Sequence, residues 1–423
     1  MTTTGRNNWP HRIWDRWTQV LTEDGKGINV LTSFQDVATD AFGRLRTSGT
    51  GQRLDVEFIY NKQPEFFDEI TSNGTVTHNT ASRDLTLSIS NTTAGTHATM
   101  RSHPVPYTPG SSQLIDITGV LDLAAIGGGT AQVFLRSSVT GSVVETVVDQ
   151  ANWSEDTVDD VDWTESHIFA MDFQSLKVGT IRFIMVRNGL PVHVHSIHND
   201  NTRDTGYWQL ASLPVYWRIY NDSTYTYMEC GYGDEDNAIG FRYRIAVNSS
   251  ATMRAICCTV KSEGGNDLKD LEGLPRCADR GTSIVTVGTT LIPIISIRPK
   301  TTFNSLTNLG IFLPSSWSVI TDNPIRILGI LGGSLTGASW TDASGSAMEY
   351  DVSATAFSGG TEVFHGYATG ASKNTSDDIQ GLLGKMVMWN RQSSETGILT
   401  LVAERTTNTS ADVLAAIAWD EIR

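Results

Sequence analysis

The stretch Val178–His195, which reads VGTIRFIMVRNGLPVHVH, gives the clearest indication of the fold class of this chain. An apolar, β-branched run ends at Val186, and a second run, Val192–His195, follows the pair Asn188-Gly189. Asn and Gly accept the left-handed backbone that a two-residue hairpin turn requires. The stretch therefore predicts two antiparallel strands joined by a tight turn.

Other strand-like runs surround this hairpin and repeat its two-residue period. They include Leu54–Ile59, Leu85–Ile89 and Gln132–Leu135. Turn residues separate the runs at Asn73-Gly74, Gly110–Ser112 and Gly127–Gly129. Residues 51–265 are therefore predicted to form an antiparallel β-sandwich of the jelly-roll-like kind.

A second β region follows a change in composition. Residues 266–281 lack a sustained period and are predicted to connect two bodies, and residues 282–423 are predicted to form a C-terminal β-sandwich domain. Its expected strands are Ser283–Val287, Leu291–Ile297, Ile325–Leu331, Lys385–Trp389 and Ile398–Ala403. Residues 412–419 fit either a helix or a final strand. The chain is thus expected to be all-β, with an N-terminal arm and two sandwiches.

Composition limits the partners of the chain. Its 423 residues carry 31 basic and 46 acidic side chains, a net charge of −15, which disfavours binding to nucleic acid. The longest apolar stretch, Leu291–Ile297, contains Pro293 and is too short to span a bilayer, so no membrane partner is expected. The four cysteines do not form a disulfide framework in a chain of this length, and free thiols are expected.

Residues 1–50 differ from the rest because they are weakly basic and rich in tryptophan. Trp9, Trp14 and Trp17 follow spacings that predict a short helix after Pro10 with one aromatic face. Exposed tryptophan and arginine side chains dominate protein interfaces. We therefore predict an extended arm that docks on a partner, with packing on the chain's own body as the alternative.

The arm closes with Asp40–Ser48, which reads DAFGRLRTS. Phe42 and Leu45 alternate with the guanidinium groups of Arg44 and Arg46. Such a mixture of apolar anchors and planar cations suits docking on another protein. These four residues complete the predicted docking set.

Three sets of segments resemble a family of virion structural proteins from large tailed bacteriophages. The first is Asp40–Ser48, similar to the family's DAFGRLRxS. The second runs from Val178–Phe183 to Cys257–Gly265, close to ICSTVxSEGG, with Cys258 in place of a serine and Lys261 in place of an apolar residue. The third comprises Leu335–Trp340, Ser346–Asp351, Ala354–Ala356 and Gly359-Gly360, and Ala418–Ile422 is similar to a closing WxEI that favours a final strand.

The resemblance implies a non-enzymatic structural component of a tailed phage particle, made in the host cytoplasm and located in the virion. Its expected partners are portal, tail, baseplate or capsid proteins and copies of itself, with a trimer favoured. A tail, baseplate or fibre position is preferred over a capsid-surface decoration or head fibre. A second alternative is a receptor- or glycan-binding module with Trp153, Trp163 and Trp208 as stacking platforms for a host-surface glycan. An enzyme such as a capsule depolymerase ranks third.

Two clusters of side chains are candidate chemical sites. His193, His195 and His198 are placed so that they suit a metal, but structural histidines are favoured because no carboxylate has a recurrent ligand spacing beside them. The acidic loop Glu155–Asp162 between Trp153 and Trp163 suits Ca²⁺ or a sugar, but it lacks the glycine turn of a calcium loop, which favours a solvated loop. No catalytic, metal or cofactor residue is therefore assigned, and no cofactor is expected.

Overall fold

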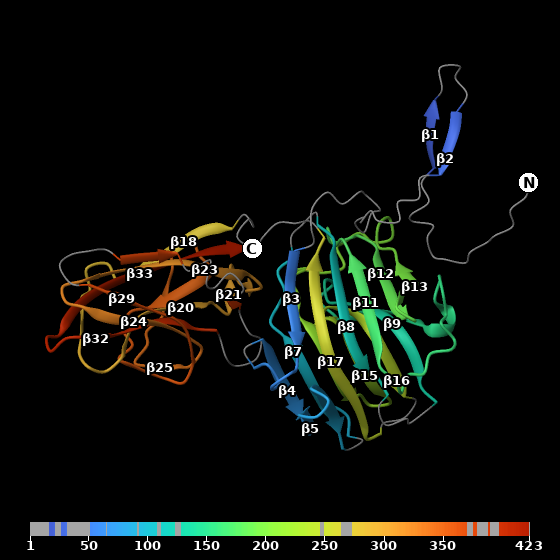
Figure 1. Cartoon of the computed structure of the whole chain (residues 1–423), viewed down its shortest axis with the longest axis horizontal. Helices are drawn as coiled ribbons and strands as arrows, with labels where there is room; N and C mark the ends of the chain where they lie inside the picture. The colour runs from blue at the N-terminus through green and yellow to red at the C-terminus, as the bar shows by residue number, and fades with distance from the viewer. Residues whose placement is uncertain are drawn as a thin grey trace, which may run out of the picture. The chain divides into compact units, whose positions relative to one another are not determined.

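A computed structural model describes the fold of the chain (Figure 1). The described residues are 17–21, 27–31, 51–64, 66–90, 93–107, 111–122, 128–245, 249–263, 273–369, 375–378, 388–389 and 397–422. Within them the chain is built from β-strands, with one 3-10 turn, η2 (Gln150–Asn152). No helix in this described part is long and apolar enough to cross a membrane.

The chain divides into two compact units, Met1–Gly265 and Asn266–Arg423. Unit 1 contains two antiparallel sheets. The seven-stranded sheet has the order β10 (Val144–Asp149), β9 (Thr130–Ser137), β16 (Ala238–Ile245), β15 (Thr226–Gly233), β14 (Val215–Asn221), β7 (His97–Ser102), β4 (Phe67–Ser72). The eight-stranded sheet has the order β13 (Leu190–Ile197), β12 (Ile181–Arg187), β11 (His167–Phe173), β8 (Gln113–Val120), β17 (Ala251–Ser262), β6 (Asp84–Ile89), β5 (Gly74–Asn79), with β3 (Gly51–Glu57) also paired to β17.

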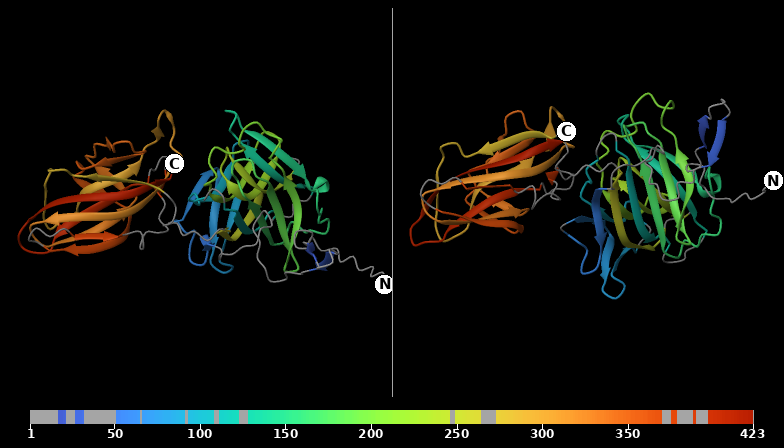
Figure 2. Two further views of the ribbon diagram at one scale, coloured as in Figure 1. Left: turned by 90° about the horizontal axis from the view of Figure 1, so that it is seen from above. Right: turned by 45° about the horizontal axis from the view of Figure 1, so that its top comes forward.

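The core of unit 1 is formed by side chains from both of these sheets (Figures 1 and 2). Alternate residues of each strand point inward because the side-chain period of a strand is two. On β15, for example, Met228, Cys230 and Tyr232 are buried in the core. The residues between them belong to the opposite face of the seven-stranded sheet.

Unit 2 is a second sandwich with a separate core. One sheet has the order β18 (Leu274–Asp279), β33 (Ala411–Ile422), β23 (Ile311–Thr321), β30 (Thr375–Asp378), with β19 (Val285–Val287) on β33 and β31 (Met388–Trp389) on β23. The other has the order β26 (Thr341–Asp342), β27 (Met348–Asp351), β20 (Ile292–Pro299), β32 (Leu399–Arg405), β24 (Ile325–Leu331), β29 (Thr361–Ala368). Two short pairs complete it: β21 (Thr302–Phe303) with β22 (Leu306–Thr307), and β25 (Ser334–Thr336) with β28 (Ala356–Ser358).

The all-β prediction is confirmed, and so is the hairpin predicted within Val178–His195. Strands β12 and β13 pair through Asn188-Gly189, where both residues have positive φ. A bulge opposite Phe183 and Ile184 shifts the register within this hairpin. Residues 412–419, which the sequence left open, lie in strand β33.

Two predictions of local structure are wrong. Residues 274–279, assigned to the connector 266–281, form β18 and pair with β33, because Ala278 supplies a side chain to the core of unit 2. The helix predicted after Pro10 does not extend over Trp17, since Trp17–Leu21 is strand β1, paired with β2 (Gly27–Leu31). Backbone pairing thus replaces the helical face there. The docking residues Trp9, Trp14, Phe42, Arg44, Leu45 and Arg46 lie outside the described residues, and only the backbone of Trp17 is described.

Candidate functional site

The three tryptophans proposed as stacking platforms are buried, which contradicts that role for two of them. Trp208 is 1% exposed and Trp153 is 5% exposed, and both belong to the core of unit 1. The indole of Trp208 packs edge-on against Phe173 and donates to the carbonyl oxygen of Arg136. Their aromatic faces are used for folding, so a sugar ring has no access to them.

Trp163, 9% exposed, differs because it lines a surface depression of about 430 Å³. Tyr243, Asp122 and the acidic loop supply the other walls. Within the loop, Asp160 pairs with Arg187, and Asp162 accepts hydrogen bonds from Thr164 that lower its pKa. Among the described residues no three His, Cys, Asp or Glu side chains are grouped as a metal would require. Asp160 and Asp162 therefore hold the chain's own groups.

The three histidines each contact a protein group in the hairpin region. His193 lies against the carbonyl oxygen of His195 and the hydroxyl of Ser196, and the Nδ1 of His195 accepts from the backbone N–H of Ser154. His198 contacts Thr180. Burial lowers the pKa of both His193 and His195. These contacts make them structural side chains, as the sequence favoured.

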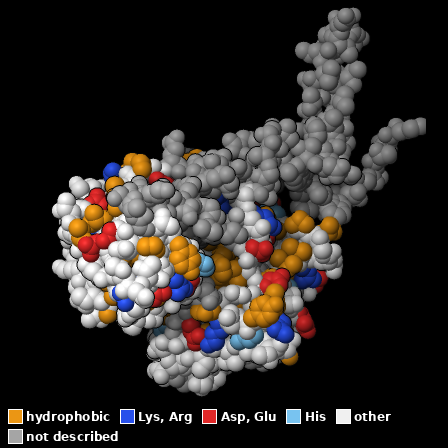
Figure 3. All heavy atoms as spheres, turned by 60° about the vertical axis from the view of Figure 1, so that its left-hand side comes forward, with side chains coloured by type: hydrophobic (Ala, Val, Ile, Leu, Met, Phe, Trp, Pro, Cys, Tyr) orange, Lys and Arg blue, Asp and Glu red, His pale blue; other side chains and the backbone are white. Residues whose placement is uncertain are grey.

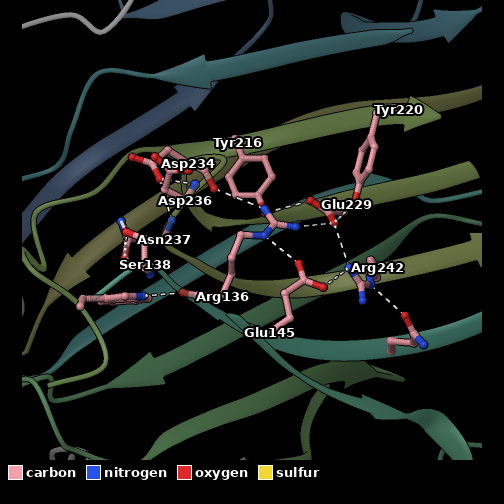
Figure 4. A network of polar contacts seen from close by, with 12 residues as sticks. Arg136, Ser138, Glu145, Tyr216, Tyr220, Glu229, Asp234, Asp236, Asn237 and Arg242 are labelled. Atoms are coloured by element: carbon pink, nitrogen blue, oxygen red, sulfur yellow. Dashed lines mark hydrogen bonds and ion pairs between the residues drawn. The ribbon is translucent and has the colours of Figure 1, made fainter. Parts of the chain in front are cut away.

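The outer face of the seven-stranded sheet carries a connected group of charged side chains (Figure 4). The register of the strands builds it. Glu229 on β15 lies between Arg242 on β16 and Arg218 on β14, and Gln132 on β9 lies beside Arg242. One row of the sheet therefore carries polar side chains on four neighbouring strands. We call Arg136, Glu145, Glu229 and Arg242 the polar network.

Glu229 is the centre of the polar network. It is 0% exposed, and its Oε1 lies 3.0 Å from Nη2 of Arg136 and 3.4 Å from Nη1 of Arg242. Although burial opposes ionisation, the arginines, led by Arg136, hold the pKa of Glu229 at about 2. Glu229 is therefore a carboxylate at neutral pH and does not supply the protonated acid that glycoside cleavage requires.

Aromatic rings and guanidinium groups stack beside the polar network. The ring centroids of Tyr220 and Tyr227 lie 4.8 Å apart. The guanidinium carbon of Arg218 lies 4.4 Å from the centroid of the Tyr220 ring. Tyr227 contacts Tyr225 at 6.0 Å, and Arg244 lies 4.8 Å over Tyr225. We call these five half-buried residues, Arg218, Tyr220, Tyr227, Tyr225 and Arg244, the tyrosine–arginine row.

Sequence reasoning missed both groups, although a signal for them exists. In the segments VYWRIYN (215–221) and FRYRI (241–245), arginine or tyrosine alternates with core residues, so polar and aromatic side chains share one face. What the pattern does not give is the partner strand. Arg136 and Glu229 are 93 residues apart in the chain and meet only because β9, β16 and β15 are neighbours.

Unit 2 contains two buried carboxylates within the segments that carry the family resemblance. Asp351 is 1% exposed and accepts hydrogen bonds from the backbone N–H groups of Ser339, Ser353 and Ala354. Glu421 is also 1% exposed, and it accepts from Ser346 Oγ, Ala347 N and Trp419 Nε1. We call Asp351 and Glu421 the motif carboxylates. They join segments far apart in sequence and fix the loops between strands.

A shallow depression of about 640 Å³ in unit 2 is lined in part by Ser346, whose hydroxyl donates to Glu421. Lys300 and Asp342 form an ion pair at 3.0 Å on its wall, and Phe303 lies below the Lys300 ammonium at 5.9 Å. Lys300 and Asp342 on its wall are thus paired with each other. On the face drawn in Figure 3, hydrophobic side chains occur among polar and charged ones. Exposed ones elsewhere include Tyr60 at 80% and Leu306 at 72%.

The comparisons with known proteins give no family. No protein-family model matches the chain, and no curated protein matches it significantly. Similar solved structures include an endo-1,3-β-glucanase from Streptomyces sioyaensis (9% identity, 51% of this chain, 98% of that chain, TM-score 0.29). They also include the Emp47p carbohydrate recognition domain (12%, 53% and 98%, 0.20) and the CBM22-1-CBM22-2 tandem domain from Paenibacillus barcinonensis Xyn10C (9%, 89% and 98%, 0.22).

Proposed function

We propose that this chain is a non-enzymatic structural component of a tailed bacteriophage particle, on the tail, baseplate or fibre side, that assembles as a symmetric oligomer through residues 1–50. The observation that carries the proposal is the place of the resembling segments in the fold. Cys257–Ser262 lie in β17, a central strand that pairs with β3, β6 and β8. These residues build a scaffold.

The motif carboxylates support the same interpretation. Asp351 binds the segments Leu335–Trp340 and Ala354–Ala356, and Glu421 binds Ser346–Asp351 to the last strand. Arg298 adds a further link, since its guanidinium pairs with Glu349 and lies 4.0 Å over the ring of Trp340. The segments that resemble the phage family therefore hold loops and strands in place, which is a structural role. A particle subunit, repeated by symmetry, needs such a fixed architecture.

The proposal is tested on particles assembled in host cells that supply only one version of the chain. Quantitative immunoblotting and immunogold labelling of purified particles measure its incorporation and its position. The arm variant combines Phe42→Ala with Arg44→Glu. The matched control combines Leu176→Ala with Lys177→Glu, which removes an exposed aliphatic side chain and reverses a charge on the body of unit 1.

We expect wild type and the control to be incorporated equally, and the arm variant to fall by about tenfold or more, because truncating interface anchors costs 2 kcal/mol or more. Absence of the wild-type chain from particles would overturn the proposal. Equal incorporation of the arm variant would remove the docking role from the arm. Gold label on the head would move the chain to the alternative position of a decoration protein or head fibre.

A further inference from the structure

Strand β10 is the end strand of the seven-stranded sheet, and apolar side chains are exposed along it. Among the described residues it pairs only with β9, over six residues and without a register shift. Val143, Val144 and Val147 are 48%, 56% and 37% exposed. Val148 packs against the core of unit 1, whereas Val144, on the same face of the strand, lies beyond that core. One side of β10 thus lacks a strand partner in the described part of the chain, and exposed valines lie beside it.

The strands at the other ends of the two sheets of unit 1 are protected against further pairing. Natural proteins protect such edges with charges, prolines and bulges. Strand β4 carries Asp68 and Glu69, and Lys62 pairs with Glu69. Strand β13 contains Pro191 and a bulge in its pairing with β12. Strand β5 has polar threonines at its exposed positions.

Strand β10 has little of this protection. Its segment Val143–Asp149 contains no proline, lysine or arginine. Its two acidic side chains are held by neighbours in the same sheet, since Glu145 pairs with Arg136 and Asp149 accepts a hydrogen bond from Gln132. An open edge of this composition is suited to the addition of another strand. Of the four end strands, β10 is therefore the best acceptor.

The N-terminal arm contains a hairpin that has no third strand among the described residues. Strands β1 and β2 pair with each other over five residues and form a two-stranded sheet of their own (Figure 1). An isolated two-stranded hairpin is at best marginally stable in water, and a further strand is needed for independent stability. The sequences of the two strands, WTQVL and GINVL, are rich in residues that favour strands. The hairpin lacks a third strand, and β10 lacks one on its open side.

Charge favours the arm over a second body as the occupant of this edge. Residues 1–50 carry six Lys or Arg and five Asp or Glu, whereas residues 51–423 carry 25 and 41. Two bodies of such acidity repel each other at close range. The arm is weakly basic, so it approaches the edge of an acidic body without that repulsion.

The length of the chain between the hairpin and the body allows the arm to reach a neighbour. Residues 32–50 join β2 to β3. When extended, this segment spans about 65 Å. A domain of about 200 residues has a radius of gyration of about 17 Å. The hairpin is therefore able to extend past its own body.

We propose that the β1–β2 hairpin of one copy pairs with strand β10 of a neighbouring copy and extends its seven-stranded sheet. The inference rests on the proposed docking role of residues 1–50 and names the surface that receives them. Main-chain hydrogen bonds join the strands, as in other cases of strand addition, and the exposed valines of β10 become covered. Because the two surfaces in this contact differ, the contact is heterologous, and heterologous contacts generate rings such as a trimer.

Sedimentation velocity of the full chain over a concentration series measures the association. The edge variant combines Val144→Lys with Thr146→Lys, two exposed positions on one face of β10. Its matched control combines Thr75→Lys with Thr77→Lys, which have the same spacing and are exposed on β5. We expect the control to associate like wild type and the edge variant about tenfold or more weakly, because lysine on an edge strand blocks pairing and an unpaired charge in the contact is costly. Equal melting temperatures show that both variants are folded.

A second variant changes the hairpin, and mixing the two variants tests the pairing. The arm variant combines Val20→Pro with Val30→Pro, which removes a backbone N–H from each strand of the hairpin. Its control, Thr3→Pro with Thr4→Pro, lies outside both strands. We expect the arm variant, like the edge variant, to stay monomeric at concentrations where wild type associates. A mixture of the two is expected to form one-to-one pairs, because the edge variant supplies an intact hairpin and the arm variant supplies an intact β10.

A photo-crosslink identifies the contact without the lysine or proline variants. Benzoylphenylalanine takes the place of Val143, which is exposed at the start of β10. Isotope-labelled and unlabelled copies are mixed so that mass spectrometry separates crosslinks between copies from crosslinks within one copy. We expect crosslinks to the peptide of the other copy that contains β1 and β2. This measurement decides the question if a variant fails to fold.

Several outcomes overturn the inference. A wild-type chain that stays monomeric excludes the contact, and so does a mixture of the two variants that forms no pairs. An arm variant that associates like wild type, with crosslinks from β10 to another β10, means that the occupant is a second body. Crosslinks to the hairpin of the same copy mean that the arm packs on its own body.

Failure of this inference is distinguishable from failure of the proposed function. An edge variant that associates like wild type, while the arm variant does not, means that the arm docks on a different surface, and the proposed function then stands without this acceptor. A chain that gives the expected crosslinks but is absent from phage particles keeps the contact between copies and loses the phage role.

Discussion

Glu229 in unit 1 and Glu421 in unit 2 are both almost completely buried carboxylates, yet they are stabilised in different ways. Glu229 lies among guanidinium groups, with Arg136 at 3.0 Å. Glu421 accepts hydrogen bonds from the neutral donors Ser346, Ala347 and Trp419. The first arrangement joins side chains across one sheet face, and the second pins a loop to a terminal strand. A buried carboxylate thus fixes the position of the groups that donate to it: arginine side chains around Glu229, and a loop and a tryptophan around Glu421.

The largest effect is expected from Glu229→Gln. This substitution keeps the shape of the side chain but leaves Arg136 and Arg242 with a buried excess of positive charge. Removing one charged partner from a buried ion-pair network lowers the free energy of unfolding by about 3–5 kcal/mol. Hydrogen exchange read by mass spectrometry is expected to show faster exchange in β15 and β16, with β33 unchanged. A loss below about 1 kcal/mol would contradict a central role for Glu229.

The pH dependence of the stability of unit 1 tests whether Glu229 is ionised in the folded protein. The pKa of Glu229 is about 2 in the folded protein and about 4.5 when unfolded, so the folded state binds this proton more weakly. The stabilisation is present above pH 4.5 and is lost as pH falls toward 2, a change of about 3 kcal/mol. Denaturant unfolding of wild type and Glu229→Gln at pH 6 and pH 3 measures it. We expect the gap between the two proteins to narrow at pH 3, and a constant gap would refute the assigned pKa.

A smaller effect is expected from Glu421→Gln. The amide keeps one acceptor oxygen but turns an N–H₂ group toward a donor, which leaves a buried group unsatisfied at a cost of about 1–3 kcal/mol. Exchange should increase in β33 and in the loop at Ser346, and β15 in unit 1 should be unaffected. If Glu421→Gln destabilised its unit more than Glu229→Gln destabilises the other, the contrast between charged and neutral partners would be wrong.

The smallest effect is expected from Arg298→Gln. Its ion pair with Glu349 is partly exposed, with side-chain exposures of 28% and 18%, and its stacking on Trp340 occurs near the surface. Partly exposed pairs and cation–π contacts each contribute about 0.5–1 kcal/mol. We expect a loss of that size in thermal melts, reduced further at high salt. A salt-independent loss would mean that packing of the arginine stem, rather than charge, is the source.

Some features of the candidate sites could be predicted from local sequence patterns, and others could not. Structural roles for His193 and His195 were foreseen, because a strand hairpin surrounds them with its own polar groups. The prediction that Trp153 and Trp208 bind a glycan is wrong, because both rings are buried in the core. The sequence around a tryptophan does not show whether its ring points outward or into a core. The polar network was missed, since Arg136, Glu229 and Arg242 come from three strands.

The residue pattern alone was enough to predict that the chain is built from strands, where several of them begin and end, and that Asn188-Gly189 forms a hairpin turn. These properties are local: a two-residue period and a residue that tolerates positive φ act within a few positions of the chain. The folded arrangement was needed to show which strands are neighbours, that Leu274–Asp279 belongs to a sheet, and that Thr99 lies opposite Arg218. Pairing and burial depend on contacts between residues far apart in sequence, and no local pattern encodes them.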